Sequence, residues 1–332
     1  MRTVVLGSGA WGCALAAMLA DMGHSVKLWS AFENEVESLN RNREHPALAG
    51  ARFPDSLEIT GDISVCSWAQ ALVIVTPSFA VRETARRIAP YVKRDTIVVC
   101  ASKGIENETS LCMTQIIEEE TGMPDAVALS GASHAEEVAR GMPTGCVSAC
   151  RDKSRATAVQ DMFMNPRFRV YASDDPVGVE LGGALKNVIA LCAGVCDGMG
   201  CGDNTKALLM TRGLTEMARL GVELGGRKET FAGLSGIGDL IVTCTSMHSR
   251  NRRAGILIGQ GKDAKTAMAE VGAVVEGYYA ARSAYTLSER LGVDMPISRE
   301  CYRVLYEGKP TEKVVEDLMT RSKKHESEES WI

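Results

Sequence analysis

Short apolar runs alternate with segments of helical periodicity through the first half of the chain. The runs are rich in β-branched residues, which favour buried strands. They lie at residues 3–6, 26–29, 72–75, 96–100 and 127–129. Because helical segments lie between the predicted strands, the pattern indicates successive β-α-β units and a parallel sheet.

The second half of the chain has a different pattern, which begins around Asp174-Asp175-Pro176. From there onward apolar residues recur at helical spacing and few strand candidates remain. The predicted helices cover residues 179–199, 205–224, 264–271, 278–291 and 311–319, and Pro310 starts the last of them. We therefore predict a sheet-containing domain of residues 1–174 and an all-helical domain of residues 175–332. The polar residues 323–329 form a tail that we expect to be solvated.

The length of the chain is enough for two domains, and its composition is that of a globular protein. Apolar residues make up 45% of its 332 positions and charged residues 24%, with a formal net charge of -5. This acidic balance gives no general attraction to nucleic acid or to anionic membranes. No targeting segment precedes the first strand, and no apolar run approaches the roughly 18 to 20 residues of a membrane span. We expect a cytoplasmic protein without nucleic-acid or membrane partners.

Eleven cysteines, an odd number, are scattered through predicted strands and helices. This distribution favours reduced thiols over a disulfide framework. The densest group is Cys192, Cys196 and Cys201, for which a zinc site is the alternative to buried thiols. A structural zinc site normally has four ligands in tight loops rather than cysteines along an apolar helix, so we expect no metal.

A glycine-rich turn follows the first predicted strand and opens an alanine-rich segment, residues 13–22, that should be helical. The turn reads Gly7-Ser8-Gly9-Ala10-Trp11-Gly12. Between two strands, this motif predicts dinucleotide binding: Gly7 permits a tight turn, Gly9 a close approach of the pyrophosphate, and Gly12 helix packing. The alternative is a merely glycine-rich turn. We expect an α/β fold with an N-terminal Rossmann-type doubly wound parallel sheet.

The identity of the dinucleotide depends on the end of the second strand. An acid about twenty residues beyond the glycine turn binds the ribose 2′-hydroxyl of NAD, whereas an arginine favours the 2′-phosphate of NADP. The edge position here is Ser30 or Ala31, the nearest acid is Glu33, and no basic residue follows until Arg41. We expect NAD or NADP, with NAD favoured and use of both left open.

Small and polar residues follow three predicted strands, at the ends where ligands bind in parallel sheets. Thr76-Pro77-Ser78 and Ser102-Lys103-Gly104 are two of these turns. Lys103 is either a surface charge or a functional residue. In the third turn, residues 130–137, Ser133 is expected to cap a helix, paired with Glu136 or Glu137.

Two polar features interrupt the helical half. Lys186 and Asn187 lie within a long apolar and small-residue stretch. A buried lysine there would have a lowered pKa suited to proton transfer, and the alternative is an amine that reaches water. Residues 249–253, Ser-Arg-Asn-Arg-Arg, form a cationic cluster that suits a phosphate, with a helix starting near Ser249. A solvated basic face or an RNA contact is the alternative, but the chain is only 5% aromatic.

With these residues the chain resembles glycerol-3-phosphate dehydrogenase of the soluble, bacterial NAD(P)-dependent type. The resemblance runs from the glycine turn to about Glu307. It is carried by residues 7–12, 102–104, 139–144, 182–187, 202–206, 211–213, 236–245, 249–253 and 275–277. It implies reversible hydride transfer between the nicotinamide and C2 of sn-glycerol 3-phosphate, which gives dihydroxyacetone phosphate. It further implies a homodimer and a role in glycerophospholipid synthesis.

The resemblance also implies site residues. Lys186 matches the proton acceptor and donor, and the catalytic group is Lys186, Lys103 and Asp239. The substrate-binding set is Lys103, Asn187, Asp239, Thr243, Ser249, Arg250, Asn251, Gly131 and Ser133. The cofactor-binding set is Gly7, Ser8, Gly9, Ala10, Trp11, Gly12, Lys103, Ala135, Arg250, Val275 and Glu276.

The chain departs from the family pattern at two places. Ala132 and His134 stand where the family has proline and phenylalanine, and we assign no catalytic role to His134. Ala31 replaces the usual basic residue after the second strand, which argues against strong use of NADP. Two alternative hypotheses remain. The chain could be another two-domain dehydrogenase, acting on a hydroxyacid or an acyl-CoA, or it could be a nicotinamide-binding sensor without turnover. No histidine lies in a setting that matches the His–Glu pair of hydroxyacyl-CoA dehydrogenases, and a sensor has no use for Lys186.

Overall fold

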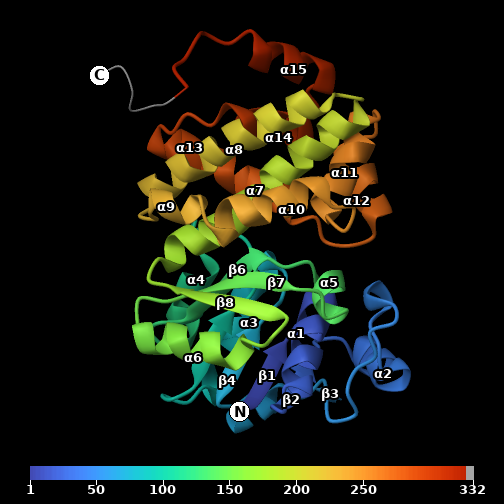
Figure 1. The fold of residues 1–332 in the computed structure, drawn as a ribbon, viewed down its shortest axis with the longest axis vertical. Coiled ribbons are helices and arrows are strands. Elements are labelled where there is room, and N and C mark those ends of the chain that lie inside the picture. Colours follow the sequence, from blue (N-terminus) through green and yellow to red (C-terminus); the bar gives the residue numbers. More distant parts are fainter. Residues whose placement is uncertain (327–332) are drawn as a thin grey trace.

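The computed structural model describes residues 1–326 and has an eight-stranded sheet beneath a helical half (Figure 1). The strand order is β3-β2-β1-β4-β5-β6-β7-β8. The strands are β1 (Arg2–Leu6), β2 (Ser25–Trp29), β3 (Glu58–Thr60), β4 (Ala71–Ile74), β5 (Ile97–Cys100), β6 (Val127–Ala132), β7 (Thr144–Ala149) and β8 (Phe168–Ser173). β6 and β7 are antiparallel and all other neighbours are parallel. The first six strands therefore have the order 3-2-1-4-5-6 of dinucleotide-binding sheets.

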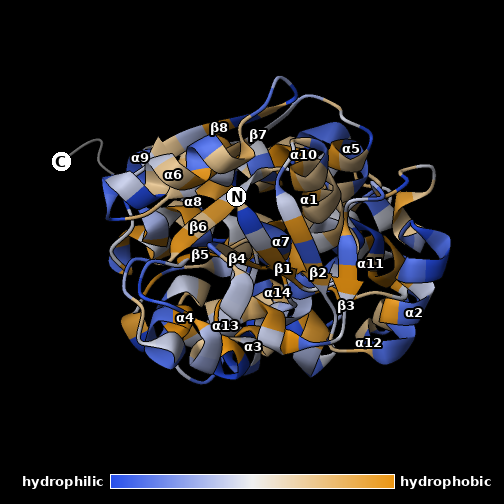
Figure 2. Ribbon diagram, turned by 90° about the horizontal axis from the view of Figure 1, so that it is seen from below, coloured by the Kyte–Doolittle hydropathy of each residue, from blue (hydrophilic) through white to orange (hydrophobic). Residues whose placement is uncertain are grey.

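Helices cover both faces of this sheet. They are α1 (Ala10–Asp21), α2 (Glu33–Asn42), α3 (Val81–Ile88), α4 (Met113–Thr121), α5 (Ala135–Ala139) and α6 (Lys153–Phe163). Successive side chains of a strand point to opposite faces. Accordingly, Val5 joins the core beneath α1 and α6, whereas Val4 joins the core beneath α3 and α4. Hydrophobic residues run through the central strands, and α2 shows both polar and apolar residues (Figure 2).

The second half is built around one long helix, α7 (Pro176–Gly198), which packs against α8, α10, α11 and α13 (Figure 1). The remaining helices are α8 (Asp203–Glu223), α9 (Lys228–Phe231), α10 (Asp239–Thr245), α11 (Arg250–Gly259), α12 (Ala264–Val271), α13 (Glu276–Leu291), α14 (Pro296–Glu307) and α15 (Thr311–Met319). α7 is long and apolar enough to cross a membrane, but 89% of its most apolar window is buried inside the protein. It is therefore a core helix.

Glycines bring α7 and α11 into main-chain contact. A Cβ added at Gly194 would lie 2.1 Å from the carbonyl oxygen of Arg252, and one at Gly255 would lie 2.1 Å from that of Leu191. Gly198 and Gly259 make equivalent approaches one turn later. Any larger side chain would push the two helices apart.

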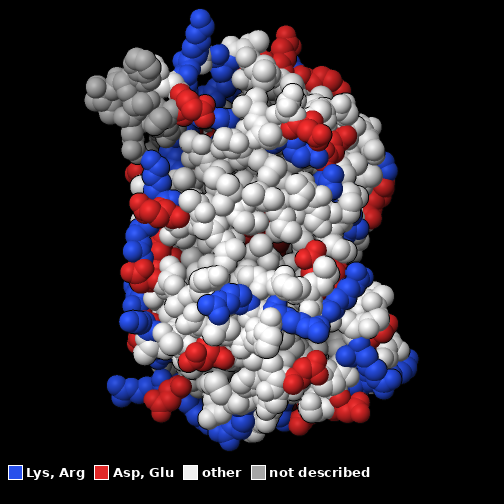
Figure 3. All heavy atoms as spheres, viewed as in Figure 1, with Lys and Arg blue, Asp and Glu red and all other residues white. Residues whose placement is uncertain are grey.

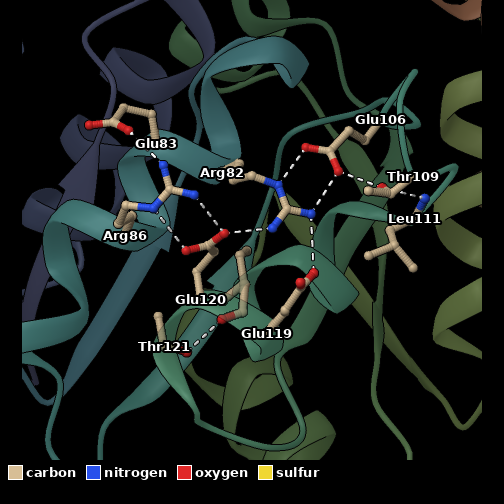
Figure 4. A network of polar contacts seen from close by, with 10 residues as sticks. Arg82, Glu83, Arg86, Glu106, Thr109, Leu111, Glu119, Glu120 and Thr121 are labelled. Carbon is tan, nitrogen blue, oxygen red and sulfur yellow. Dashed lines mark hydrogen bonds and ion pairs between the residues drawn. The ribbon is translucent and has the colours of Figure 1, made fainter.

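An ion-pair network fastens the segment after β5 to helices α3 and α4 (Figure 4). Arg82 binds both carboxylate oxygens of Glu106, each at 2.7 Å, and donates to Glu120 at 2.5 Å. Arg86 also binds Glu120, at 3.0 and 3.1 Å. Bidentate geometry fixes orientation as well as distance. The network therefore restrains the segment after β5, which carries Lys103.

The structure confirms the predicted fold class. The five predicted strands and the five predicted helices are all present, with ends that differ from the prediction by at most three residues. Strands β3, β7 and β8 were not predicted. The predicted cap at Ser133 is wrong, because α5 begins at Ala135 after His134 and has no side-chain cap. The Ser133 hydroxyl instead donates to the carbonyl of Gly131 at 3.1 Å.

Lysine and arginine are interspersed with aspartate and glutamate on the face in Figure 3. All eleven cysteines are free, and among Cys192, Cys196 and Cys201 the middle one is buried. Residues 1–326 contain no group of three or more histidine, cysteine or acidic side chains placed to hold a metal. The predicted polar tail is exposed at residues 323–326, and its last three residues lie outside the described range.

Candidate active site

Two lysines converge on one aspartate where the sheet meets the helical half. The amine of Lys186 donates to Oδ1 of Asp239 and to the hydroxyl of Thr243, both at 2.6 Å. The amine of Lys103 donates to Oδ2 of Asp239 at 2.6 Å and to the carbonyl of Gly131 at 3.0 Å. Asp239 therefore joins a lysine from the segment after β5 to a lysine from α7.

The elements around Asp239 explain this convergence. Asp239 is the first residue of α10, directly after a π-helical turn over Leu234–Gly238. Thr243 follows one turn later and therefore lies on the same face of α10. Its hydroxyl donates to the main-chain carbonyl of Asp239 at 2.6 Å, which leaves its oxygen free to accept a hydrogen bond from the amine of Lys186. Both side chains are thus held against α7.

Paired glycines in α7 let the rest of the site come close. A Cβ at Gly182 would lie 2.6 Å from the carbonyl oxygen of Ser235 in the π-helical turn. A Cβ at Gly183 would lie 2.6 Å from Ser130 Oγ and 3.5 Å from Cδ of Lys103. Lys186 follows one turn later on the same helix. The two glycines therefore allow the segment with Lys103 and the π-helical turn before Asp239 to pack closely against α7.

Burial and charge together set the protonation of the cluster. Lys186 is 6% exposed and Asp239 is 1% exposed. Burial lowers the pKa of Lys186 to about 8; the charge of Asp239 opposes the fall and that of Lys103 adds to it. Burial alone would raise the pKa of Asp239, but the two lysines hold it below its usual value. Lys186 is thus a buried cation that can give up a proton near neutral pH.

Asn187, the neighbour of Lys186, belongs to a chain of amide bonds between helices. Its Oδ1 accepts from Nδ2 of Asn251 at 2.8 Å, and Oδ1 of Asn251 accepts from the main-chain N–H of Gly277 at 2.8 Å. Both asparagines are buried. Ser249 caps α11 by accepting from the N–H of Arg252 at 3.1 Å. These side chains therefore fix the N-terminal ends of α11 and α13 beside α7.

The three arginines of the predicted cationic cluster have different surroundings. Arg250, the first residue of α11, is exposed. Arg252 binds Asp197 at 2.7 Å and the carbonyl of Thr245 at 2.9 Å, so its charge is neutralised within the protein. Arg253 has a buried Nε without a hydrogen-bond partner in residues 1–326. Arg250 is therefore the arginine best placed to bind an anion.

Glu276, the first residue of α13, connects the helical half to the sheet. Its carboxylate accepts from the N–H of Ser78 at 3.1 Å and from its hydroxyl at 2.6 Å. Burial raises the pKa of Glu276, while the bonds from Ser78 and the charge of Arg250 partly oppose that rise. Val275 before it is buried, as is Ala135 at the start of α5.

The glycine turn has the geometry that a dinucleotide needs. A Cβ at Gly7, where φ is +123°, would lie 2.7 Å from the carbonyl oxygen of Val75, and one at Gly12 would lie 1.9 Å from that of Gly7. Nothing lies within 4 Å of a Cβ at Gly9, which precedes α1. The first turn of α1 has no side-chain cap, so its N–H groups can bind an anion. Trp11 Nε1 and Thr76 Oγ1 are buried without partners among the described residues. These residues fit a bound pyrophosphate.

Two residues near the site have roles that the pattern did not predict. His134 has its Nε2 3.4 Å from the carbonyl of Val242, and burial lowers its pKa, as does the charge of Lys186. Glu35, rather than the exposed Glu33, reaches the end of β2, where it binds Ser8 and Ser30. The sequence alone does not single out Glu35, because its orientation depends on where α2 begins, and the start of α2 has no side-chain cap that would mark it.

Comparisons with known proteins agree over both halves. The models for the N-terminus and the C-terminus of NAD-dependent glycerol-3-phosphate dehydrogenase match residues 2–156 and 175–316. A glycerol-3-phosphate dehydrogenase [NAD(P)+] from Agathobacter rectalis is 50% identical over 327 residues, 98% of this chain and 97% of the relative. One from Moorella thermoacetica is 50% identical over 326 residues, with the same coverage of both chains.

Solved structures give the same result. The glycerol-3-phosphate dehydrogenase of Coxiella burnetii superposes with a TM-score of 0.93 at 35% identity and covers 96% of this chain and 99% of its own. That of Saccharomyces cerevisiae superposes with a TM-score of 0.82 at 26% identity, covering 97% and 99%. The chain therefore belongs to the NAD-dependent glycerol-3-phosphate dehydrogenase family.

Proposed function

We propose that the chain reversibly transfers a hydride between NAD(P)H and dihydroxyacetone phosphate to give sn-glycerol 3-phosphate. The observation that carries this proposal is the buried Lys186, whose pKa is lowered to about 8 and whose amine is aimed by Asp239 and Thr243. Proton transfer to a carbonyl oxygen is best served by a group that titrates near the working pH. The names of the relatives support the same reaction.

In reduction, the protonated amine of Lys186 polarises the C2 carbonyl and gives its proton to the carbonyl oxygen. In oxidation, the neutral amine takes the proton of the C2 hydroxyl. The nicotinamide, when bound, supplies or accepts the hydride. Asp239 and Thr243 hold the amine of Lys186 through hydrogen bonds of 2.6 Å. Lys103 supplies a second cation, so the Lys103–Asp239–Lys186 group has a net positive charge facing the anionic substrate.

We assign the substrate phosphate to the N-terminal end of α11. Arg250 brings an exposed guanidinium, and the first N–H groups of α11 add favourable dipoles. Ser249 and Asn251 fix the N-terminal end of α11 through hydrogen bonds to other protein groups, the N–H of Arg252 and the N–H of Gly277 respectively. Gly131, Ser133 and Asn187 flank the three-carbon part in the proposal.

We place the dinucleotide over the glycine turn. Gly7, Ser8, Gly9, Ala10, Trp11 and Gly12 hold its pyrophosphate, and Lys103, Ala135, Arg250, Val275 and Glu276 lie along the remainder. NAD is the proposed cofactor, since Ala31 provides no cation for a 2′-phosphate.

The wider setting is proposed from family resemblance. It comprises a homodimer in the cytoplasm, a supply of glycerol 3-phosphate for glycerophospholipids, and domains of residues 1–174 and 175–332. Strand β8 ends at Ser173 and α7 begins at Pro176, which supports a boundary between them.

A direct assay tests the reaction. Purified protein is mixed with dihydroxyacetone phosphate and either NADH or NADPH, and the absorbance at 340 nm is followed. We expect oxidation of NADH or NADPH, and none when an unphosphorylated 2-oxoacid such as pyruvate replaces dihydroxyacetone phosphate. Absence of oxidation with both cofactors would contradict the proposal.

A further inference from the structure

Three side chains join the glycine turn, the end of β2 and helix α2 at one edge of the cofactor site. Oε2 of Glu35 accepts from the hydroxyl of Ser8 and, at 2.8 Å, from that of Ser30. The two hydroxyl oxygens are 2.7 Å apart, and the N–H of Phe32 donates to Ser30 at 3.2 Å. Ser8 and Ser30 are buried, and Glu35 is half-buried. The carboxylate of Glu35 is therefore held by two segments outside its own helix.

The position of this group gives it a function. β1 and β2 are parallel neighbours with Leu6 opposite Trp29, so Ser8 and Ser30 emerge close together beyond the strand ends. In dinucleotide-binding sheets the adenine ribose lies at this point, and an acid there binds its 2′-hydroxyl. That acid usually follows β2 directly, where this chain has Ser30 and Ala31. Here the first turn of α2 supplies a carboxylate to the same place.

We propose that Glu35 selects NAD over NADP by accepting hydrogen bonds from the adenine ribose hydroxyls and repelling a 2′-phosphate. This inference rests on the proposed function only in that the chain binds a nicotinamide dinucleotide. Oε2 is occupied by the serines, whereas Oε1 has no donor within hydrogen-bond distance in the described part of the chain. Oε1 is therefore free to accept a ribose hydroxyl.

The charges around α2 support the exclusion of a phosphate. Its first turn carries Glu33 and Glu35, which offset the positive end of the helix dipole. Arg41 lies in the last turn, about 9 Å further along the axis at 1.5 Å per residue. The guanidinium of Arg43 is bound to the carbonyls of Pro54 and Leu57. Neither Arg41 nor Arg43 is thus placed to neutralise a 2′-phosphate.

Arg87 and His45 also fail to supply that charge. Arg87 lies over the ring of Trp29 at 5.0 Å, and Trp29 packs in the core beneath α3 and α4. α2 instead buries Val36 in the core on the opposite face of the sheet. Burial lowers the pKa of His45, although the charge of Glu35 opposes the fall, so this histidine is mainly neutral at pH 7.

Binding of the two cofactors tests the inference without turnover. Dissociation constants for NADH and NADPH are measured by calorimetry on the wild type, Glu35→Gln and Glu35→Lys, with Glu33→Gln as the matched control. We expect the wild type to prefer NADH. The charge of Glu35 facing a phosphate of about two charges corresponds to roughly a 10- to 100-fold effect. Glu35→Gln should lower the preference for NADH by that factor, Glu35→Lys should lower it further, and Glu33→Gln should change it less than about threefold.

Other outcomes would overturn the inference. A wild type that binds NADPH as tightly as NADH would do so, as would variants that melt like the wild type and keep its preference. Equal weakening of both cofactors in Glu35→Gln would mean that the carboxylate serves only to hold α2 on the sheet. Selective NADH binding without oxidation by dihydroxyacetone phosphate would instead refute the proposed function and leave the role of Glu35 standing.

Discussion

Replacement of Asp239 by asparagine tests how strongly its carboxylate supports the pKa of Lys186. The carboxylate lies 2.6 Å from both amines and partly offsets the effect of burial on the pKa of Lys186. At an effective dielectric constant of about 20, one such pair interacts by at most about 6 kcal/mol. Asparagine still accepts a hydrogen bond and water relaxes around the site, so we expect a net change of about 3 kcal/mol. One unit of pKa is about 1.4 kcal/mol, so the pKa of Lys186 should fall by about two units.

This fall has opposite consequences for the two directions of the reaction. With a pKa of about 8, Lys186 is about nine-tenths protonated at pH 7; with a pKa near 6, it would be about one-tenth protonated. Asp239→Asn should therefore reduce dihydroxyacetone phosphate about tenfold more slowly at pH 7, and recover at lower pH. Oxidation needs the neutral amine, so the rate of oxidation should begin to rise at a pH about two units lower than in the wild type.

The assay is the pH profile of kcat/KM in both directions, measured between pH 5 and 9. Asp263→Asn is the control, because it removes an exposed carboxylate that caps α12 and leaves asparagine, which also caps helices. Profiles of Asp239→Asn that coincide with those of the wild type, in a protein that remains folded, would refute the proposed effect of Asp239 on the pKa of Lys186.

Four further changes have defined outcomes. Lys186→Ala should lower turnover by several orders of magnitude while calorimetry shows nearly unchanged NADH affinity; preserved turnover would remove Lys186 from the mechanism. Arg250→Met should raise KM for dihydroxyacetone phosphate by roughly 100-fold with a smaller change in kcat, and an unchanged KM would place the phosphate elsewhere. Burial raises the pKa of Glu180 to about 7, so the folded state binds the extra proton and stability should fall as pH rises from about 5 to 7. Glu180→Gln should flatten that fall in urea titrations, and an identical slope would contradict it. Arg82→Met should lower the free energy of unfolding by about 1–3 kcal/mol, against no loss for exposed Arg94→Met.

The glycine turn and Lys186 could be found from sequence because each depends on local context. Gly7, Gly9 and Gly12 lie between a strand and a helix, and Lys186 interrupts an apolar helix. By contrast, Asp239 lies 136 residues from Lys103 in the chain, and only the packed fold brings the two together. The family resemblance indicated Asp239 and Lys103, but their positions in the sequence did not show that they are in contact.

Other features depend on tertiary pairing that no local pattern encodes. Arg252 looked equivalent to Arg250 within a basic run, yet Asp197 of α7 neutralises it. Glu35 was passed over in favour of Glu33 because the expected acid follows β2 directly, whereas helix α2 turns Glu35 back toward the glycine turn. Strand β7 was missed since it pairs antiparallel in a sheet that was predicted to be parallel.

The glycine contacts between α7 and α11 have a consequence for substrate length. Lys186 lies on α7, and the proposed phosphate site lies at the first turn of α11. Gly194 and Gly255 bring the main chains of these helices together with no side chain between them. The span from proton donor to phosphate is thus determined by backbone geometry, which does not readjust as rotamers do. If the proposed site is correct, a substrate whose carbonyl is one carbon farther from its phosphate would place one group out of reach, so we expect this helix pair to select for chain length.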